Sequence, residues 1–230
     1  MTNLPIIKKN TEIQKINKNL SIVNRLLPTV ELQSSFNKLA WWNTLSQGWK
    51  YVFWGELNIS EIEFNKKPDF YLEKLFNTTT ELWFDYDLVD FYKIQDISPL
   101  GNLTQLTTLM FWGGKCQIQD ISALGNLIKL KKLYLSENKI QNISALGNLI
   151  KLKKLYLSEN KIQNISSLGN LTQLTSLDLE YNQIRDISPL VKLENLETLY
   201  LKGNPITQLD IDWLQSKLPN CKINSEDDDY

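Results

Sequence analysis

The chain contains two adjacent segments that are almost identical. Residues 127–148 read Leu-Ile-Lys-Leu-Lys-Lys-Leu-Tyr-Leu-Ser-Glu-Asn-Lys-Ile-Gln-Asn-Ile-Ser-Ala-Leu-Gly-Asn, and residues 149–170 repeat them with one change, Ala145 to Ser167. A fixed period of 22 residues predicts a solenoid, in which each repeat packs against its neighbours. Because a solenoid offers a continuous surface and no enclosed site, this pattern favours binding over chemistry.

The same period continues on both sides of the duplicate. Spacings of 22 residues separate Leu133, Leu155, Leu177 and Leu199. Upstream, Leu109 and Leu82 continue the series at spacings of 24 and 27, which implies insertions of two and five residues. The sequence therefore predicts six repeats, from about Thr79 to Leu209.

The repeated pattern, Leu-x-x-Leu-x-Leu-x-x-Asn-x-Ile, is copied cleanly by residues 152–162. With Ile97-Ser-Pro-Leu-Gly-Asn-Leu-Thr-Gln-Leu106 and Ile187-Ser-Pro-Leu190, it resembles the leucine-rich repeat family, in particular the 22-residue internalin-like class of bacteria. The resemblance implies an α/β solenoid that is curved, with a parallel β-sheet on its concave face and short helical turns on its convex face.

The residues support this fold independently. In Leu133-Tyr134-Leu135 the leucines alternate with a polar-tipped residue, so one strand face is expected to be buried and the other open. Ser98-Pro99 and Ser188-Pro189 predict a helix N-cap followed by proline in the first helical position. A single helical turn is therefore expected on the outer face of each repeat.

One turn position is occupied by asparagine in four successive repeats, at Asn138, Asn160, Asn182 and Asn204. A side-chain amide both donates and accepts hydrogen bonds, so stacked copies are expected to tie successive turns together. Cys116 occupies the equivalent position of an earlier repeat, where a structural role is expected.

Both ends of a solenoid need caps, because a terminal repeat has a neighbour on one side only. Residues 1–78 are expected to form a helical N-terminal cap, residues 79–209 the six repeats, residues 210–223 a C-terminal cap and residues 224–230 an acidic, disordered tail. The expected helices cover Ile13–Leu27, Thr29–Ala40, Thr44–Leu57, Pro68–Phe76 and Asp210–Leu218. The N-terminal region also holds a tryptophan-rich segment, similar to one that precedes the repeats of other bacterial leucine-rich repeat proteins, at Trp41, Trp42, Trp49 and Trp54.

The composition excludes several classes of function. The chain has no histidine and two cysteines, so Ser-His-Asp and Cys-His catalysis and histidine-based zinc sites are excluded. We expect no enzyme, no cofactor and no metal site. A net charge of −1 argues against nucleic acid as a partner, and the absence of a long apolar run argues against a membrane span or secretory signal. The expectation is a cytoplasmic monomer with reduced thiols, while secretion by a signal-independent route remains open.

Candidate binding residues follow from the alternation of the strands. Side chains on the open face form columns across the repeats, and aromatic groups forced outward are common anchors of binding surfaces. The predicted partner-binding residues are Trp83, Asp85, Tyr86, Met110, Trp112, Tyr134, Tyr156, Asp178, Glu180, Tyr181, Tyr200 and Lys202. The two insertions, Asp85–Lys93 and Trp112–Gln117, are expected to project from one rim beside this face.

Each of these signals has a structural alternative. Tyrosines suit a pleated surface and can fill a column by packing on one another. The insertions can simply adapt the first repeats to the helical cap. Six lysines of the duplicated segments make a local basic patch, which we interpret as a solvated surface and not as a phosphate site: Lys129, Lys131, Lys132, Lys151, Lys153 and Lys154.

The preferred hypothesis is a non-catalytic module that binds a protein or peptide on the concave face. The main alternative is a secreted, internalin-like adhesin or host-interacting factor. Carbohydrate binding through the aromatic column, and a cysteine-dependent ligase, are weaker alternatives. The sequence does not identify the partner.

Overall fold

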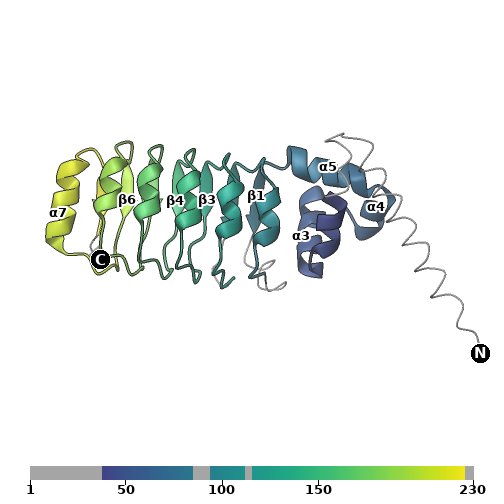
Figure 1. Ribbon diagram of the computed structural model, residues 1–230, viewed down its shortest axis with the longest axis horizontal. Coiled ribbons are helices and arrows are strands. Elements are labelled where there is room, and N and C mark those ends of the chain that lie inside the picture. The colour runs from purple at the N-terminus through teal and green to yellow at the C-terminus, as the bar shows by residue number, and fades with distance from the viewer. Residues whose placement is uncertain (1–37, 85–93, 112–115, 226–230) are drawn as a thin grey trace, which may run out of the picture.

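The computed structural model describes residues 38–84, 94–111 and 116–225, and everything below concerns these residues (Figure 1). Seven short strands form one parallel sheet in the order β1-β2-β3-β4-β5-β6-β7. The strands are β1 (Glu81–Phe84), β2 (Thr108–Phe111), β3 (Lys132–Tyr134), β4 (Lys154–Tyr156), β5 (Ser176–Asp178), β6 (Thr198–Tyr200) and β7 (Lys222–Asn224). The molecule is an elongated stack with helices at both ends, as Figure 1 shows.

From β1 to β6, a short 3-10 helix lies between successive strands, and these helices cover one face of the sheet (Figure 1). These turns are η1 (Ser98–Asn102), η2 (Ser122–Asn126), η3 (Ser144–Asn148), η4 (Ser166–Asn170) and η5 (Ser188–Lys192). The predicted single helical turn per repeat is confirmed, although its hydrogen bonding is of the 3-10 type.

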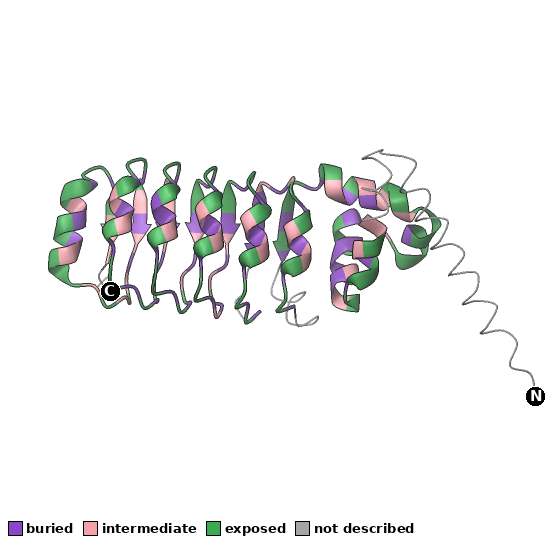
Figure 2. Ribbon diagram, in the orientation of Figure 1, coloured by how far each residue is buried: buried purple, intermediate pink, exposed green. Residues whose placement is uncertain are grey.

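The register of the sheet aligns the repeated leucines, because Leu82 pairs with Leu109, Leu133 with Leu155 and Leu177 with Leu199. All are buried between the sheet and the 3-10 turns, and Figure 2 shows the buried positions along that interior. The predicted α/β solenoid with a parallel sheet is therefore confirmed.

The sheet contains one more strand than the six repeats predicted. Strand β7 pairs with β6, placing Ile223 beside Leu199. The segment Lys222-Ile223-Asn224 lacks the Leu-x-Leu pattern; its first two residues belong to the predicted C-terminal cap and its third to the predicted tail. The spacing of 24 residues between Leu199 and Ile223 was the available signal.

The asparagine ladder is present. The Oδ1 atom of Asn160 accepts a hydrogen bond from Ile140 N, and its Nδ2 atom donates to the carbonyls of Leu135 and Leu157, all at 3.0 Å. Asn182 repeats this arrangement one repeat later. Each amide thus joins two repeats and satisfies buried backbone groups that no strand partner reaches.

The prediction that Ser98 and Ser188 cap these turns is wrong. Neither side chain makes a capping bond; instead Ser98 N donates to Asp96 Oδ1 and Ser188 N to Asp186 Oδ1, both at 2.8 Å. The side chain that accepts this hydrogen bond lies two residues before the serine, where an aspartate or asparagine closes a local turn. The same position is filled in the other repeats by Asp120, Asn142 and Asn164.

The N-terminal region packs as helices: residues 38–44, α3 (Gln47–Leu57), α4 (Glu61–Lys66) and α5 (Pro68–Thr78). The helix predicted from Thr44 begins at Gln47 instead, because Ser46 is its N-cap. Helix α4 was not predicted, although Ser60 and Glu63 form a reciprocal capping box. The expected helix at Ile13–Leu27 and residues 29–37 of the next one lie outside the described residues.

The tryptophan-rich segment builds the core of the helical region. The Trp42 ring stacks on Phe64 with centroids 4.1 Å apart. Trp49 joins this core to the first repeat, since its Nε1 donates to Asp96 O at 2.9 Å and its ring meets Phe84 edge-on at 5.7 Å. These residues therefore serve packing.

At the other end of the stack, helix α7 (Gln208–Lys217) follows the last full repeat. Its N-cap, Thr207, forms a second capping box with Asp210. Ile211 and Leu214 are its buried residues. This helix therefore covers the apolar end of the core.

Candidate functional site: the open face of the sheet

The sheet face that points away from the 3-10 turns is called the open face below. Its central column follows the strand register, which places Trp83 beside Met110, Met110 beside Tyr134, Tyr134 beside Tyr156, Tyr156 beside Asp178 and Asp178 beside Tyr200. Sequence alternation thus places all six of these predicted residues in one line.

Tyr134 and Tyr156 stack face to face, with ring centroids 4.6 Å apart and planes 4° apart. Both are half-buried, and the Tyr156 hydroxyl lies 3.0 Å from Ser176 Oγ. Burial, with the neighbouring Tyr156, raises the pKa of Tyr134. The two stacked rings form one aromatic surface, and the Tyr134 hydroxyl is uncharged at neutral pH.

The two residues before the tyrosines in this column differ in exposure. Trp83 is 58% exposed, and its Nε1 donates to Glu81 Oε2 at 3.3 Å. Met110, between Trp83 and Tyr134 in the register, is only 8% exposed. Met110 as a binding residue stays a prediction, and its low exposure shows that alternation gives the direction of a side chain but not how far it is buried.

A polar row lies beside the tyrosines. Ser158 Oγ donates to Ser136 Oγ at 2.8 Å. Asp178 is half-buried and accepts a hydrogen bond from Glu180 N at 3.0 Å. Burial raises the pKa of Asp178, and hydrogen bonds from Glu180 N and Ser158 partly offset that rise. This carboxylate favours a positively charged or hydrogen-bond-donating group opposite it.

The far end of the open face carries Tyr181, Tyr200 and Lys202. Tyr181 is exposed with a positive φ of 50°, and Lys202 Nζ lies 5.7 Å from the centre of its ring. The Tyr181 ring also lies against Gly203, where any Cβ would come within 2.4 Å of Tyr181 Cδ1. The ring therefore contacts Gly203, where a larger side chain would clash with it, and has a cation nearby.

The structure adds two residues to this face that the site prediction omitted. Lys132 and Lys154 pair in the register and lie two residues before Tyr134 and Tyr156, so they share the open face with them. The same alternation predicts them, because residues two apart in a strand share a face. The site prediction considered only the residues that follow the repeated leucine, such as Tyr134, and not the residue before it, such as Lys132.

Three predicted residues, Asp85, Tyr86 and Trp112, lie outside the described residues, as do the insertion at 85–93 and residues 112–115. The predicted rim site stays a prediction.

Comparison with known proteins agrees with this geometry. A family model described as leucine-rich repeats in two copies matches residues 128–170, 150–192 and 172–220. Residues 128–220 of the chain thus carry leucine-rich repeats. A search of curated proteins finds no significant match.

Solved structures of leucine-rich repeat proteins are similar to this one. The internalin InlF of Listeria monocytogenes has 34% identity and a TM-score of 0.58, over 64% of this chain and 42% of its own. A leucine-rich repeat protein of Leptospira interrogans has 30% identity and a TM-score of 0.53, over 57% of this chain and 34% of its own. The chain thus spans less than half the length of these two relatives.

Internalin C2 of Listeria monocytogenes shares the fold at 22% identity, with a TM-score of 0.56, over 78% of this chain and 93% of its own. The family model and InlF confirm the predicted resemblance to internalin-like repeats.

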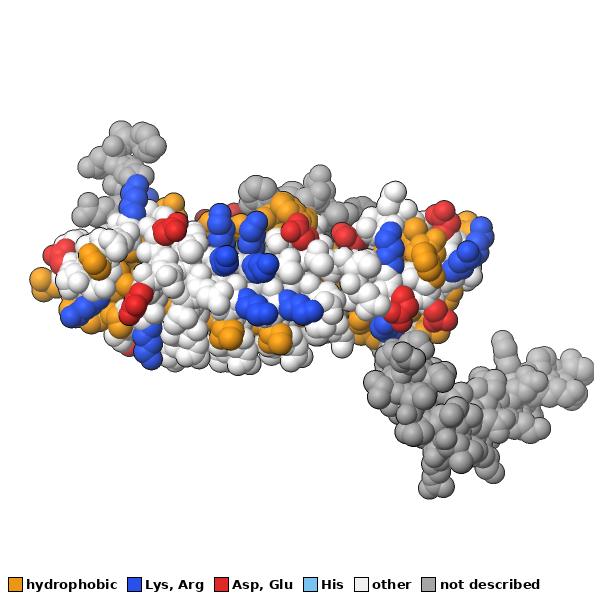
Figure 3. All heavy atoms as spheres, turned by 90° about the horizontal axis from the view of Figure 1, so that it is seen from above, with side chains coloured by type: hydrophobic (Ala, Val, Ile, Leu, Met, Phe, Trp, Pro, Cys, Tyr) orange, Lys and Arg blue, Asp and Glu red, His pale blue; other side chains and the backbone are white. Residues whose placement is uncertain are grey.

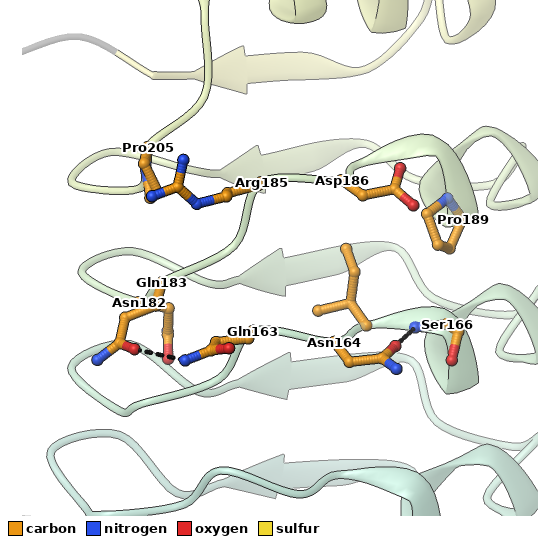
Figure 4. Close-up of a pocket in the computed structure, with 10 residues that line it drawn as sticks. Gln163, Asn164, Ser166, Asn182, Gln183, Arg185, Asp186, Pro189 and Pro205 are labelled. Atoms are coloured by element: carbon orange, nitrogen blue, oxygen red, sulfur yellow. Dashed lines mark hydrogen bonds between the residues drawn. The ribbon is translucent and has the colours of Figure 1, made fainter.

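Clefts of the described structure include spaces between successive repeats. Figure 4 shows one of about 720 Å³ on the flank of the stack. Its lining residues are Gln163, Asn164, Ile165, Ser166, Asn182, Gln183, Arg185, Asp186, Pro189 and Pro205. Smaller clefts recur between equivalent turns of earlier repeats, so we interpret this flank as a consequence of repeat spacing and not as a dedicated site.

Neither cysteine is disulfide-bonded, and both are buried. Burial raises the pKa of Cys221 to about 11, so its thiol stays protonated at neutral pH. Within the described ranges no cluster of three or more Cys, Asp or Glu side chains is arranged to hold a metal ion. No helix in the same part of the chain is long and apolar enough to cross a membrane.

Proposed function

We propose that this protein is a non-catalytic interaction module that binds a protein or peptide through the open face of its sheet. The observation that carries the proposal is the stacked pair Tyr134 and Tyr156, in line with the exposed Trp83. Rigid aromatic rings lose little entropy on binding, and tyrosine and tryptophan are enriched at binding hot spots. The leucine-rich repeat fold and the internalin-like neighbours support a protein-interaction role.

The test is affinity capture from a lysate of the native host, followed by mass spectrometry. A Tyr134→Asp, Tyr156→Asp variant is compared with wild type and with an Ile62→Asp, Leu209→Asp control. The control residues are 70% and 79% exposed and lie on the terminal helices α4 and α7, away from the open face. Circular dichroism and urea unfolding confirm that each variant is folded.

We expect a partner that wild type and the control capture and the tyrosine variant loses. Retention by the tyrosine variant would move the binding site away from the open face. A large loss of stability in that variant would mean instead that the tyrosines serve packing.

The cytoplasmic location also stays a proposal. The likeness to two internalins favours testing the alternative of a secreted, internalin-like factor. Immunoblots of cell lysate and culture supernatant from the native host separate the two. A protein confined to the lysate supports the cytoplasmic module, and one enriched in the supernatant supports the alternative.

A further inference from the structure

Six exposed lysines of two neighbouring repeats gather at the edge where strands β3 and β4 begin. We call them the lysine array: Lys129, Lys131, Lys132, Lys151, Lys153 and Lys154. Figure 3, which views the molecule from above, shows basic side chains gathered in the middle of this edge with hydrophobic side chains beside them.

The array brings like charges together. Lys132 pairs with Lys154 in the register, and Lys153 N bonds to Lys131 O at 2.8 Å. Adjacent strands are about 4.8 Å apart, so each pair places two ammonium groups opposite each other. Like charges in that arrangement destabilise a sheet, and a negatively charged ligand relieves the repulsion.

No carboxylate neutralises the array within the described structure. Among the described residues, none of the six lysines comes within salt-bridge distance of an aspartate or glutamate. Lys129 Nζ donates to the neutral Gln105 Oε1 at 2.6 Å. The neighbouring backbone positions are also neutral, with Thr107 on one side and Thr175 on the other.

The array has apolar groups on both sides. On the open face, Lys132 and Lys154 precede the stacked Tyr134 and Tyr156 by two residues. Ile128 and Ile150 stand one residue before Lys129 and Lys151 and are 55% and 53% exposed, so equivalent positions of the two repeats add exposed apolar groups beside the lysines.

We propose that these two repeats bind a short acidic segment of a protein partner, with its carboxylates on the lysine array and its apolar side chains on the tyrosine pair. This inference rests on the proposed function, because it gives the chemistry of the partner at the same face.

The surrounding charges favour a peptide over other polyanions. Glu137 and Glu159, both exposed, lie beyond the far ends of the same strands, and Asp178 follows Tyr156 in the register. An anionic membrane or a nucleic acid backbone would meet these carboxylates along with the lysines. A peptide can place acidic groups at one end of the strands and neutral or basic groups at the other.

The test measures binding of a fluorescent peptide of alternating glutamate and leucine by fluorescence anisotropy. The variant is Lys131→Gln, Lys132→Gln, Lys153→Gln, Lys154→Gln. The matched control removes four exposed lysines elsewhere on the molecule: Lys66→Gln, Lys161→Gln, Lys192→Gln, Lys217→Gln. Both variants change the net charge equally, so a difference between them reports location. Competitors are a lysine–leucine peptide, a heparin fragment and vesicles containing phosphatidylglycerol.

We expect wild type and the control to bind the acidic peptide, and the array variant to bind it about tenfold or more weakly, as several exposed ion pairs are lost together. Binding should also weaken in about 1 M salt, where charges are screened beyond about 3 Å. Equal binding by both variants, or none by wild type, overturns the inference. So does stronger, array-dependent binding of heparin or vesicles than of the peptide.

Capture of the cellular partner separates this inference from the proposed function. If the tyrosine variant loses the partner and the array variant keeps it, the open face binds a partner, but the inference that an acidic segment of that partner binds the lysine array is wrong. If both variants keep the partner, both proposals fail. Loss in both supports the two together.

Discussion

At the scale of single residues, a buried side-chain amide forms the hydrogen bonds to backbone groups that a neighbouring strand forms elsewhere in the sheet. Asn160 satisfies Ile140 N and the carbonyls of Leu135 and Leu157, which belong to two different repeats. Its side chain is therefore part of the interface between the duplicated segments.

Replacing Asn160 with alanine should destabilise the protein by about 1–3 kcal/mol, because several buried backbone groups lose their partner. Urea unfolding measures this change. Gln163→Ala is the control, since Gln163 makes its hydrogen bond to Gln183 on the exposed surface. Equal effects of the two substitutions would contradict the ladder.

Asp178→Asn should stabilise the protein at neutral pH. Burial raises the folded-state pKa of Asp178, so its favourable contribution is complete below the unfolded pKa, near 3.9, and is lost as pH rises through the folded pKa. The gain from asparagine should therefore be present at pH 7 and shrink toward about pH 3, which thermal unfolding across this range measures.

The control for Asp178→Asn is Asp120→Asn. Hydrogen bonds from Ser122 lower the pKa of Asp120, so its contribution is present above the unfolded pKa and is lost as pH falls through the folded pKa. This substitution should give no gain at pH 7. A gain of equal size in both variants would mean that the effect follows net charge and not the burial of Asp178.

At the scale of elements, capping chemistry decides where the terminal helices begin. Helices α4 and α7 both start with a reciprocal capping box, at Ser60–Glu63 and Thr207–Asp210. Each satisfies backbone N–H groups that have no partner within the helix.

Thr207→Ala should cost about 0.5–2 kcal/mol, because the free N-terminus of α7 loses its side-chain acceptor. Ser216→Ala, near the other end of the same helix, is the control, since Ser216 is exposed and not a cap. Urea unfolding followed by far-ultraviolet circular dichroism distinguishes them. An unchanged midpoint for Thr207→Ala would show that packing alone fixes the helix start.

The elements differ in how far sequence alone determines them. The leucine spacing predicted the strands and their register, because a strict period leaves one way to align buried side chains. The spacing did not predict β7, where Ile223 is the single aliphatic residue of the strand. It also did not predict α4, whose six residues are too few to show helical periodicity. Capping chemistry at Ser60 was a readable signal for α4.

The candidate site was less predictable than the fold. Alternation placed Tyr134 and Tyr156 correctly in line, but their stacking and the low exposure of Met110 depend on the three-dimensional surroundings, which alternation does not describe. Whether the open face binds a partner depends on a second molecule, which one sequence does not contain.

At the scale of the whole molecule, the helical region and the repeats are joined through Trp49. Its indole bonds to Asp96 O, and its ring meets Phe84, which in turn stacks on Phe111 at 4.3 Å. In a stack where each repeat contacts its neighbours, such a joint stabilises the nearest repeats most.

Trp49→Phe keeps an aromatic ring but removes the hydrogen bond to Asp96, at a cost of about 0.5–1.5 kcal/mol. Hydrogen exchange should then show lost protection in strands β1 and β2 and little change in β5 and β6. Uniform loss along the chain would mean that the molecule opens as one cooperative unit.

The duplicated repeats give this protein an adjustable length. Their one difference is absorbed locally, since Ser167 Oγ bonds to Ile143 O at 3.1 Å. A further copy of the repeat inserted between these two would contact, on each side, a repeat of almost the same sequence as its own. Every copy gained would widen the rows of tyrosine and lysine by one strand spacing, about 4.8 Å. The length of the open face can thus change by whole repeats, with no new kind of contact between them.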